Sequence, residues 1–383
     1  MKVQGTAWIA APWLAVGLNG DKRMREAFLD KLRVAATCAV VLLHTVTGVM
    51  DSADMSLYPT EYKIFQMILD LVCWSVPMFV IISGYLFLNP ARQIGVGKML
   101  KKYCRRIVLA LFLFGVPYAC MEQTALEGGF RWEMIGKAFV MVLKGQSWSH
   151  MWYLYLILIL YLLTPALRYL LARIPRAVIW GAELVIFTGC SVLPWVSWVW
   201  GLELQPVLPD QVIYLFYYIC GYLFVTGRQE GLLGKWGRTL RKKGIVASGI
   251  AMPGILLTGI LLSAAGMVCS RLSGTYTVQM AYAYPFTALL ALLLFGWGMT
   301  WPVQKEEQGT KAAGFRKQAA ALSFAVYLVH PVFLNIAYKA LHVTPLSFTV
   351  GISLPLFFLG TLVLSAASAW ILRRTAILRD YVL

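Results

Sequence analysis

The sequence predicts an all-α polytopic membrane protein, built as a bundle of about ten transmembrane helices with both termini in the cytoplasm. Hydrophobic residues make up 60% of the 383-residue chain and charged residues only 13%. The mean hydropathy of +0.70 lies outside the usual range of soluble domains. The apolar residues occur in blocks of about twenty, the length an α-helix needs to cross the hydrocarbon core. Helices are expected because an open sheet edge leaves backbone groups unbonded in lipid.

Ten segments have the length and composition of a membrane span. They cover about residues 34–50, 65–89, 104–121, 150–172, 177–199, 210–227, 244–268, 278–301, 319–341 and 346–372. A further apolar stretch, about 133–144 (EMIGKAFVMVLK), is too short to cross. It is predicted to lie at the membrane interface as an amphipathic helix.

The formal net charge of +17 is unevenly distributed among the connecting loops. Lys and Arg concentrate in alternate loops counted from the N-terminal segment, such as 90–106 and 228–243. The positive-inside rule therefore places these loops and both termini in the cytoplasm. Topology and contact with anionic lipid headgroups explain the basic balance, so a nucleic-acid partner is not needed to account for it.

The chain is predicted to be a membrane domain with short flanks. Residues 1–27 form an N-terminal cytoplasmic segment in which Met24 offers an alternative start, 28–372 form the transmembrane domain, and 373–383 form a cytoplasmic tail. The seven cysteines are scattered without a Cys-x-x-Cys pair or zinc spacing. This pattern favours small apolar packing residues over metal ligands, and no metal is predicted.

The first span carries an ionisable side chain far from both ends. His44 follows Arg33 by eleven residues, about 16 Å along a helix. Arg33 is therefore expected at the cytoplasmic interface and His44 at or just beyond the membrane centre. Such a residue is a functional candidate because a polar group in lipid is costly, although a bond to a neighbouring carbonyl is the structural alternative. Asp70 shares this depth and could orient and charge-balance His44, or pair instead with Lys339.

The second span contains Ser83, Gly84 and Tyr85 near its cytoplasmic end, within PMFVIISGYLF. A Ser-Gly pair allows two helices to approach closely. A bare backbone also allows a ligand to approach closely. Both interpretations stay open from the sequence.

A cluster of basic residues precedes the third span, within KMLKKYCRRIVLA. Lys98, Lys101, Lys102, Arg105 and Arg106 crowd one cytoplasmic approach. Ordinary positive-inside charge explains such a cluster. The functional alternative is a site for a phosphorylated ligand, because the arginine fork matches phosphate oxygens.

The fourth span begins with His150 and Trp152, at its predicted outer mouth. An aromatic side chain there is typical of an interface anchor, and the adjacent histidine is less routine. In the ninth span, Ser323, Tyr327 and His330 share one helical face, and Pro331 loosens the backbone beside them. Tyr327 and His330 are expected in the inner half of the membrane.

Five segments, taken in order, resemble the membrane acyltransferase 3 family, most of whose members are bacterial O-acyltransferases for cell-surface glycans. They are Asp30-Lys31-Leu32 with the Arg33-to-His44 spacing, FVIISGYLF in the second span, KKYCRRI before the third, HMWYLYLILILYLLTP in the fourth and LSFAVYLVHPVF in the ninth. The resemblance covers about residues 28–372. It implies a multi-pass protein of the bacterial plasma (inner) membrane.

The resemblance also implies acetyl-CoA as the acyl donor. By analogy His44 carries the chemistry, while Arg33 and the Ser83-Gly84-Tyr85 turn help to hold the donor. In this hypothesis Arg33, Arg105 and Arg106 bind the phosphates at the inner face, and the pantetheine arm brings the thioester toward His44.

The acceptor is hypothesised to be a hydroxyl of a glycan or lipid-linked sugar that enters from the outer side past Trp152 and His150. His44 would remove the hydroxyl proton as a general base, and an acyl-histidine intermediate is the alternative. Asp70 would support His44, and Tyr327 or His330 would support the developing oxyanion.

Two other function classes stay open from the sequence. A small-molecule transporter or exporter suits ten spans with a polar core, although the chain shows no repeat symmetry. A non-catalytic partner of a glycan-assembly machine is the second. The partners predicted for the enzyme are acyl-CoA, the glycan or lipid-linked sugar, and the bilayer.

Overall fold

The computed structural model describes residues 18–202, 204, 207–229, 282–301 and 310–383. All regular secondary structure in these ranges is helical. The elements are α1 (Leu18–Ser52), η2 (Met55–Leu57), α2 (Pro59–Val72), α3 (Ser75–Phe87), α4 (Val96–Lys98), η3 (Met99–Cys104), α5 (Arg105–Glu127), α6 (Glu133–Leu143), η4 (Ser149–Met151), α7 (Trp152–Leu171), α8 (Arg176–Phe187), η5 (Thr188–Val192), α9 (Leu193–Trp200), η6 (Asp210–Val212), α10 (Ile213–Gln229), α13 (Pro285–Thr300), α14 (Lys311–Asn335), η9 (Ile336–Ala340), η10 (Pro345–Ser347), α15 (Val350–Leu372) and α16 (Ala376–Tyr381).

Seven helical segments in the described ranges are long and apolar enough to cross a membrane. They are Ala27–Ser52, Pro59–Phe87, Val96–Glu127, Ser149–Leu171, Arg176–Trp200, Lys311–Ala340 and Val350–Leu372, and Pro285–Thr300 is a shorter apolar helix. The predicted all-helical, multi-span architecture is confirmed for this part of the chain. The span predicted at 244–268 lies outside the described residues. The count of ten and the cytoplasmic termini therefore stay predictions.

The second predicted span, 65–89, is longer than expected and is broken in its middle. It begins at Pro59, and a turn at Cys73–Trp74 separates α2 from α3. Pro77 lies in the first turn of α3. It has no N–H for the carbonyl of Cys73, so the helix cannot run through this point undisturbed.

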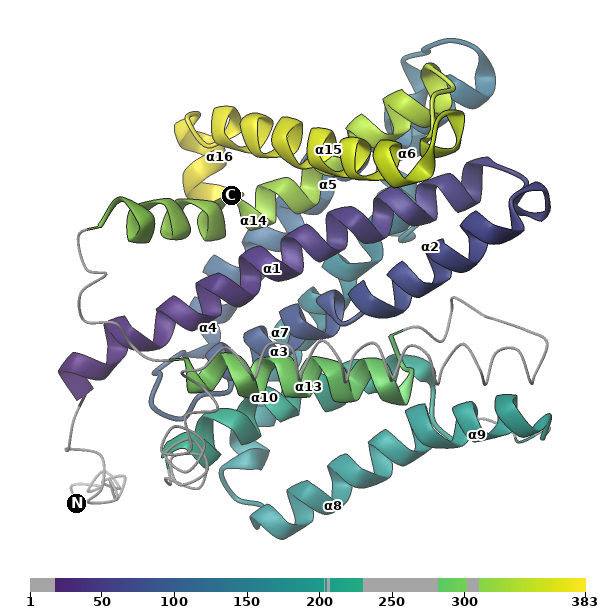
Figure 1. The fold of residues 1–383 in the computed structure, drawn as a ribbon. Helices are drawn as coiled ribbons and strands as arrows, with labels where there is room; N and C mark the ends of the chain where they lie inside the picture. Colours follow the sequence, from purple (N-terminus) through teal and green to yellow (C-terminus); the bar gives the residue numbers. More distant parts are fainter. Residues whose placement is uncertain (1–17, 203, 205–206, 230–281, 302–309) are drawn as a thin grey trace, which may run out of the picture.

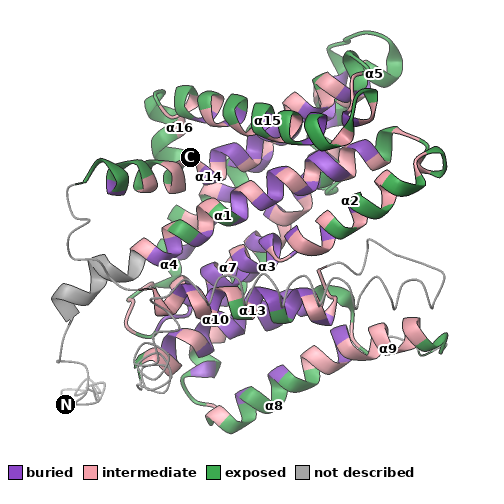
Figure 2. Cartoon of the chain, in the orientation of Figure 1, coloured by how far each residue is buried: buried purple, intermediate pink, exposed green. Residues whose placement is uncertain are grey.

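Helix α1 occupies the middle of the bundle (Figure 1), where it packs against α2, α3, α13, α14 and α15. Helices α14 and α15 lie on one side of it, and α3, α10 and α13 on the other. The buried residues gather along these central helices, whereas α8 and α15 expose most of their length (Figure 2). In the most apolar part of each span, 56% of the residues are buried in the α1 span but only 22% in the α15 span. The outer helices therefore have the apolar exterior expected toward lipid.

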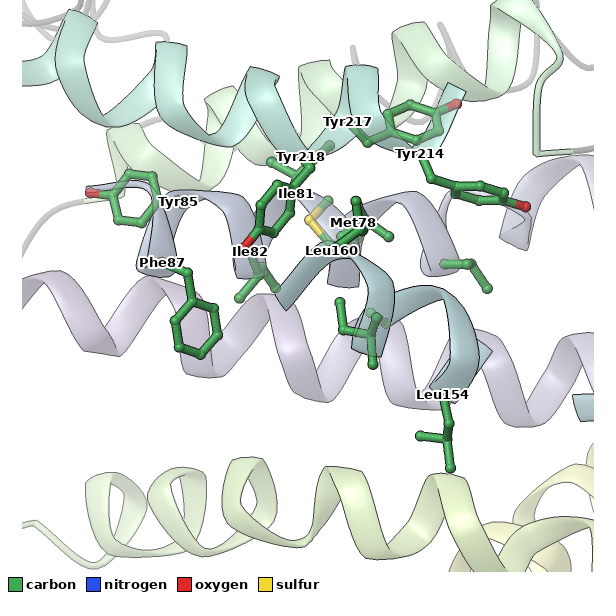
Figure 3. Packing of buried hydrophobic residues seen from close by; sticks show 14 of the residues in the cluster. Met78, Ile81, Ile82, Tyr85, Phe87, Leu154, Leu160, Tyr214, Tyr217 and Tyr218 are labelled. Carbon is green, nitrogen blue, oxygen red and sulfur yellow. The ribbon is translucent and has the colours of Figure 1, made fainter. Parts of the chain in front are cut away.

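Helices α3 and α10 form the tightest contact of the core. A Cβ added to Gly84 would lie 1.9 Å from the carbonyl oxygen of Tyr218, and one added to Gly221 would lie 2.4 Å from that of Ile81. Only glycine permits this approach. Aromatic rings of α10, including Tyr218, pack here beside the apolar side chains of α3 and α7 (Figure 3).

The end of the α14 span widens into a π-helical segment, η9. Pro331 interrupts the regular helical bonding just before it. Tyr338 then reaches α1, where its hydroxyl donates to the carbonyl oxygen of Thr45 at 3.1 Å. Its ring lies against Gly48, at which an added Cβ would come within 2.9 Å of the ring. This contact joins α14 to α1 directly beside His44.

A histidine cluster beside an arginine-lined cavity

Three of the four histidines in the chain converge at one point in the bundle. His44 comes from α1, His150 from η4 and His330 from α14. The ring of His330 lies 4.9 Å from that of His44 and 5.8 Å from that of His150, and the rings of His44 and His150 are 6.4 Å apart, centroid to centroid. His150 and His330 are buried, whereas His44 is only partly buried. His44 is therefore the accessible member of this histidine cluster.

Backbone carbonyls determine which nitrogen of two of these rings carries the hydrogen. Nδ1 of His44 lies 2.9 Å from the carbonyl oxygen of Val40. Nδ1 of His330 lies 2.8 Å from that of Tyr327 and 3.1 Å from that of Val326. A carbonyl only accepts hydrogen bonds, so each Nδ1 is assigned the proton and each Nε2 a lone pair. In His44, the nitrogen left free is one that can accept a proton.

His150 is held through its backbone. Its carbonyl oxygen accepts a hydrogen bond of 2.5 Å from the hydroxyl of Tyr327, and its ring lies 5.1 Å from that of Tyr118. Both ring nitrogens are buried without a hydrogen-bond partner within the part of the chain that the structure describes. They are polar groups that a ligand hydroxyl would satisfy. No cluster of His, Cys, Asp or Glu in the same ranges could hold a metal ion.

A cavity of about 460 Å³ lies between α1, α3, α5, α7 and α14. Four arginines line it, namely Arg33, Arg92, Arg106 and Arg373. Its aromatic lining consists of Phe79, Phe87, Tyr103, Tyr153, Tyr161, Phe324 and Tyr327. No acidic side chain is among the described residues that line it. Such a set of guanidinium groups favours an anionic ligand.

The protein holds these guanidinium groups in place with backbone and side-chain oxygens. Arg33 bonds Asp30 at 3.2 Å. Arg106 donates from Nε to the carbonyl oxygen of Val382 at 2.8 Å, and Arg373 donates to that of Ala321. Each arginine retains further N–H groups, because a guanidinium has five.

The cavity ends close to the histidine cluster. Its lining reaches Val40 and Tyr327. Val40 is the residue whose carbonyl bonds His44, four residues or about 6 Å further along α1. The Tyr327 side chain lies at the boundary, since it both lines the cavity and bonds His150. The arginine-lined cavity and the histidine cluster therefore adjoin along α1 and together form one elongated site.

A family model described as an acyltransferase domain matches residues 26–374. The chain belongs to the acyltransferase 3 family. No curated protein and no solved structure matches it significantly. Family and fold together make it a multi-pass membrane acyltransferase.

The structure of this acyltransferase brings most of the predicted site residues together. Arg33, Ser83, Arg106 and Tyr327 line the cavity. His44, His150 and His330 form the histidine cluster. The five predicted segments therefore meet in space, although their catalytic and binding roles stay predictions.

Four other predicted residues lie away from the cavity lining. Gly84 faces Tyr218 of α10, and the ring of Tyr85 packs 5.6 Å from that of Phe295. Arg105 stacks on the ring of Tyr381 at 5.1 Å. Trp152 packs against Tyr214 and Tyr282 at 5.5 and 5.6 Å. The close-helix alternative explains Gly84.

The prediction that Asp70 orients His44, or pairs with Lys339, stays a prediction. The contacts of His44 described above are with Val40, His150 and His330, and the charge of Asp70 acts on Cys73 one turn away on its own segment. Lys339, the alternative partner, lies over the ring of Trp148 and interacts with the charge of Asp51.

One detail of the sequence-based site is corrected. The sequence predicts His330 in the inner half of the membrane and His150 at an outer mouth, but both are buried beside His44 and so share one level. Helix α14 begins at Lys311, eight residues before the predicted span. The oxyanion role of Tyr327 or His330 stays a prediction; the Tyr327 hydroxyl donates to the His150 carbonyl, and Nδ1 of His330 lies against the Tyr327 carbonyl.

Sequence reasoning missed Arg92 and Arg373, which it counted only as loop and tail charge. It also missed Tyr153 and Tyr161, which line the cavity beside Ser83. Both tyrosines lie in the HMWYLYLILILYLLTP segment. Their spacing of eight residues, about two turns of helix, could have marked a polar face.

Proposed function

We propose that the protein transfers an acetyl group from cytoplasmic acetyl-CoA to a hydroxyl of an extracytoplasmic cell-surface glycan or lipid-linked sugar in the bacterial inner membrane. The observation that supports this function is the arginine-lined cavity that ends one helical turn from His44. An anionic donor and a basic imidazole then meet along α1.

The donor would lie in the cavity with its phosphates toward the guanidinium groups. Arg33, Arg92, Arg106 and Arg373 supply charge and paired N–H donors for phosphate oxygens. A cavity of about 460 Å³ is within the size range of small-molecule sites. The pantetheine arm would follow the aromatic lining past Tyr327 and bring the thioester to His44.

His44 would act as the general base. Its free Nε2 takes the proton from the acceptor hydroxyl, and the oxygen attacks the thioester carbonyl. The carbon–sulfur bond then breaks, the acetyl ester forms, and the imidazolium returns its proton to the leaving thiolate. The hydrogen bond from Nδ1 to the carbonyl of Val40 holds the ring in the tautomer that this step needs.

The acceptor would approach from the side of the histidine cluster opposite the cavity. The unbonded nitrogens of His150 would hold its hydroxyl next to His44, a role supported by their lack of another partner among the described residues. By the positive-inside rule, this side would be extracytoplasmic. Transfer across the membrane would follow from the two substrates reaching one imidazole from opposite compartments.

The test uses inside-out membrane vesicles from cells that express the protein, supplied with radiolabelled acetyl-CoA. Label is expected in surface glycan or lipid-linked sugar with the wild type but not with His44→Asn. The asparagine amide can keep the bond to the Val40 carbonyl but has no basic nitrogen. His342→Asn is the matched control, because His342 is exposed and has a positive φ, which asparagine tolerates.

Three results would contradict the proposal. Equal labelling by His44→Asn and wild type would exclude the general-base role. Uptake of acetyl-CoA with its thioester intact would favour a transporter. Label from acetyl-CoA that never reaches a hydroxyl would exclude O-acyl transfer.

A further inference from the structure

The turn that follows α3 is held by an arginine from another helix. Arg168 of α7 donates from one terminal nitrogen to the carbonyl oxygens of Phe87 and Asn89, at 2.8 and 2.9 Å. Its other terminal nitrogen donates to the carbonyl oxygen of Arg92 at 2.6 Å. One guanidinium therefore bonds three carbonyls within six residues.

The turn is also closed from within. The backbone N–H of Arg92 donates to the carbonyl oxygen of Asn89 at 3.1 Å. The side-chain oxygen of Asn89 accepts from the backbone N–H of Ala91 at 2.9 Å and from the amide of Gln229 at 3.3 Å. The turn is attached to α7 through the bonds of Arg168 and through the ring of Phe87, which lies 4.6 Å from that of Tyr161.

Arg168 does more than cap α3. The last regular helical hydrogen bond of α3 runs from the N–H of Leu88 to the carbonyl oxygen of Gly84. The carbonyls of the final turn have no partner within the helix, so a C-terminal cap would need to bond only these, such as the carbonyl of Phe87. Two of the three acceptors, on Asn89 and Arg92, lie beyond the helix. Two of the three bonded residues, Phe87 and Arg92, have side chains that line the cavity, and Arg92 is the one that brings a positive charge to it.

We propose that Arg168 is a positioning residue for the anionic donor, acting through Arg92. It does not itself line the cavity, but it fixes the backbone from which the Arg92 guanidinium enters it. Lysine cannot replace it, because one ammonium group does not reproduce the planar fork that reaches three acceptors. The inference rests on the proposed function, since it concerns acetyl-CoA binding at the same cavity.

The test measures the dissociation constant for acetyl-CoA with purified protein in lipid nanodiscs. Arg168→Lys is expected to weaken binding by on the order of tenfold, as one charge-assisted contact would, and Arg92→Ala by a similar factor. The double variant should bind no more weakly than Arg92→Ala alone. Arg173→Lys is the control, because Arg173 lies on the following turns and bonds only the Tyr169 carbonyl among its described hydrogen bonds.

A second readout separates positioning from general damage. Acetyl transfer from S-acetylpantetheine, which has no nucleotide phosphates, should proceed at the wild-type rate in Arg168→Lys. If Arg168→Lys does not yield folded protein, Asn89→Ala loosens the same turn from its other side and is expected to show the same pattern.

The outcomes distinguish this inference from the proposed function. Independent, multiplicative effects of the two substitutions, or equal losses with both donors, would reduce Arg168 to a structural support. Wild-type protein that binds no acetyl-CoA would overturn the proposed function, and the role of Arg168 with it.

Discussion

The two faces of α3 differ in what they do, although their residues are adjacent in sequence. Ser83 lines the cavity together with Tyr153 and Tyr161. Gly84, the next residue, faces α10 at a distance that no side chain could occupy. Successive residues point about 100° apart around a helix, so one motif can serve a binding site and a packing contact at once.

Arg105 and Arg106 repeat this difference at the start of α5. Arg106 lines the cavity, whereas Arg105 stacks on Tyr381 of α16. Changes on a packing face should remove the folded protein, and changes on the cavity face should leave it folded but impaired. The following predictions test that division.

The largest effect is expected at the packing face. In Gly84→Val the new side chain would collide with the Tyr218 backbone, force α3 from α10 and cost about 3 kcal/mol or more. Little monodisperse protein should be recovered after detergent extraction, and its unfolding temperature should fall. Gly95→Val is the control, because nothing lies within 4 Å of that position. A Gly84→Val protein that melts like the wild type would refute the close contact.

At the cavity face, Arg106→Ala should fold normally but bind acetyl-CoA on the order of tenfold more weakly or worse, through the lost charge-assisted bonds. Arg105→Ala should change binding little. Titration calorimetry on the two variants makes the comparison within one pair of neighbouring residues. Equal losses of affinity in the two variants would mean that acetyl-CoA binding depends on the overall positive charge of this region and not on the arginines that line the cavity.

A smaller effect is expected at the boundary between cavity and histidines. Tyr327→Phe removes the hydroxyl that bonds the His150 carbonyl, a contribution of ~1 kcal/mol. The turnover rate should fall about fivefold, the factor that corresponds to this energy, with donor affinity unchanged. A large change in donor affinity with unchanged turnover would instead place Tyr327 among the donor-binding residues.

The smallest effect is expected for Ser83→Ala. It removes one hydroxyl from a group that still contains Tyr153 and Tyr161, so acetyl-CoA binding should weaken only about twofold. A loss of folded protein like that of Gly84→Val would show that the two faces of α3 are not separate.

The sequence predicted the helical membrane class because apolar composition and segment length depend on the bilayer alone. It also identified all three clustered histidines, since polar side chains in apolar spans are conspicuous. It could not tell Ser83 from Gly84, or Arg105 from Arg106. Spans that are apolar on every side carry no periodicity to reveal which face meets which neighbour.

The predicted level of His330 in the membrane was the other error of the sequence analysis. The segment KAAGFRKQ (311–318) is polar enough to be assigned to a loop, yet it forms the first turns of α14. Hydropathy reports where a segment enters lipid, and a helix can begin well before that point. The level of His330 therefore required the structure.

The π-helical segment η9 has a consequence for how this part of the chain can vary. Its wider turn accommodates a residue that a regular α-helix would not. Deleting Ile336 or Ala337 would let the narrower helix form and rotate Tyr338 by about 100° relative to the preceding turns, away from Thr45 and Gly48. This segment should consequently tolerate many replacements of side chains but no change in its length.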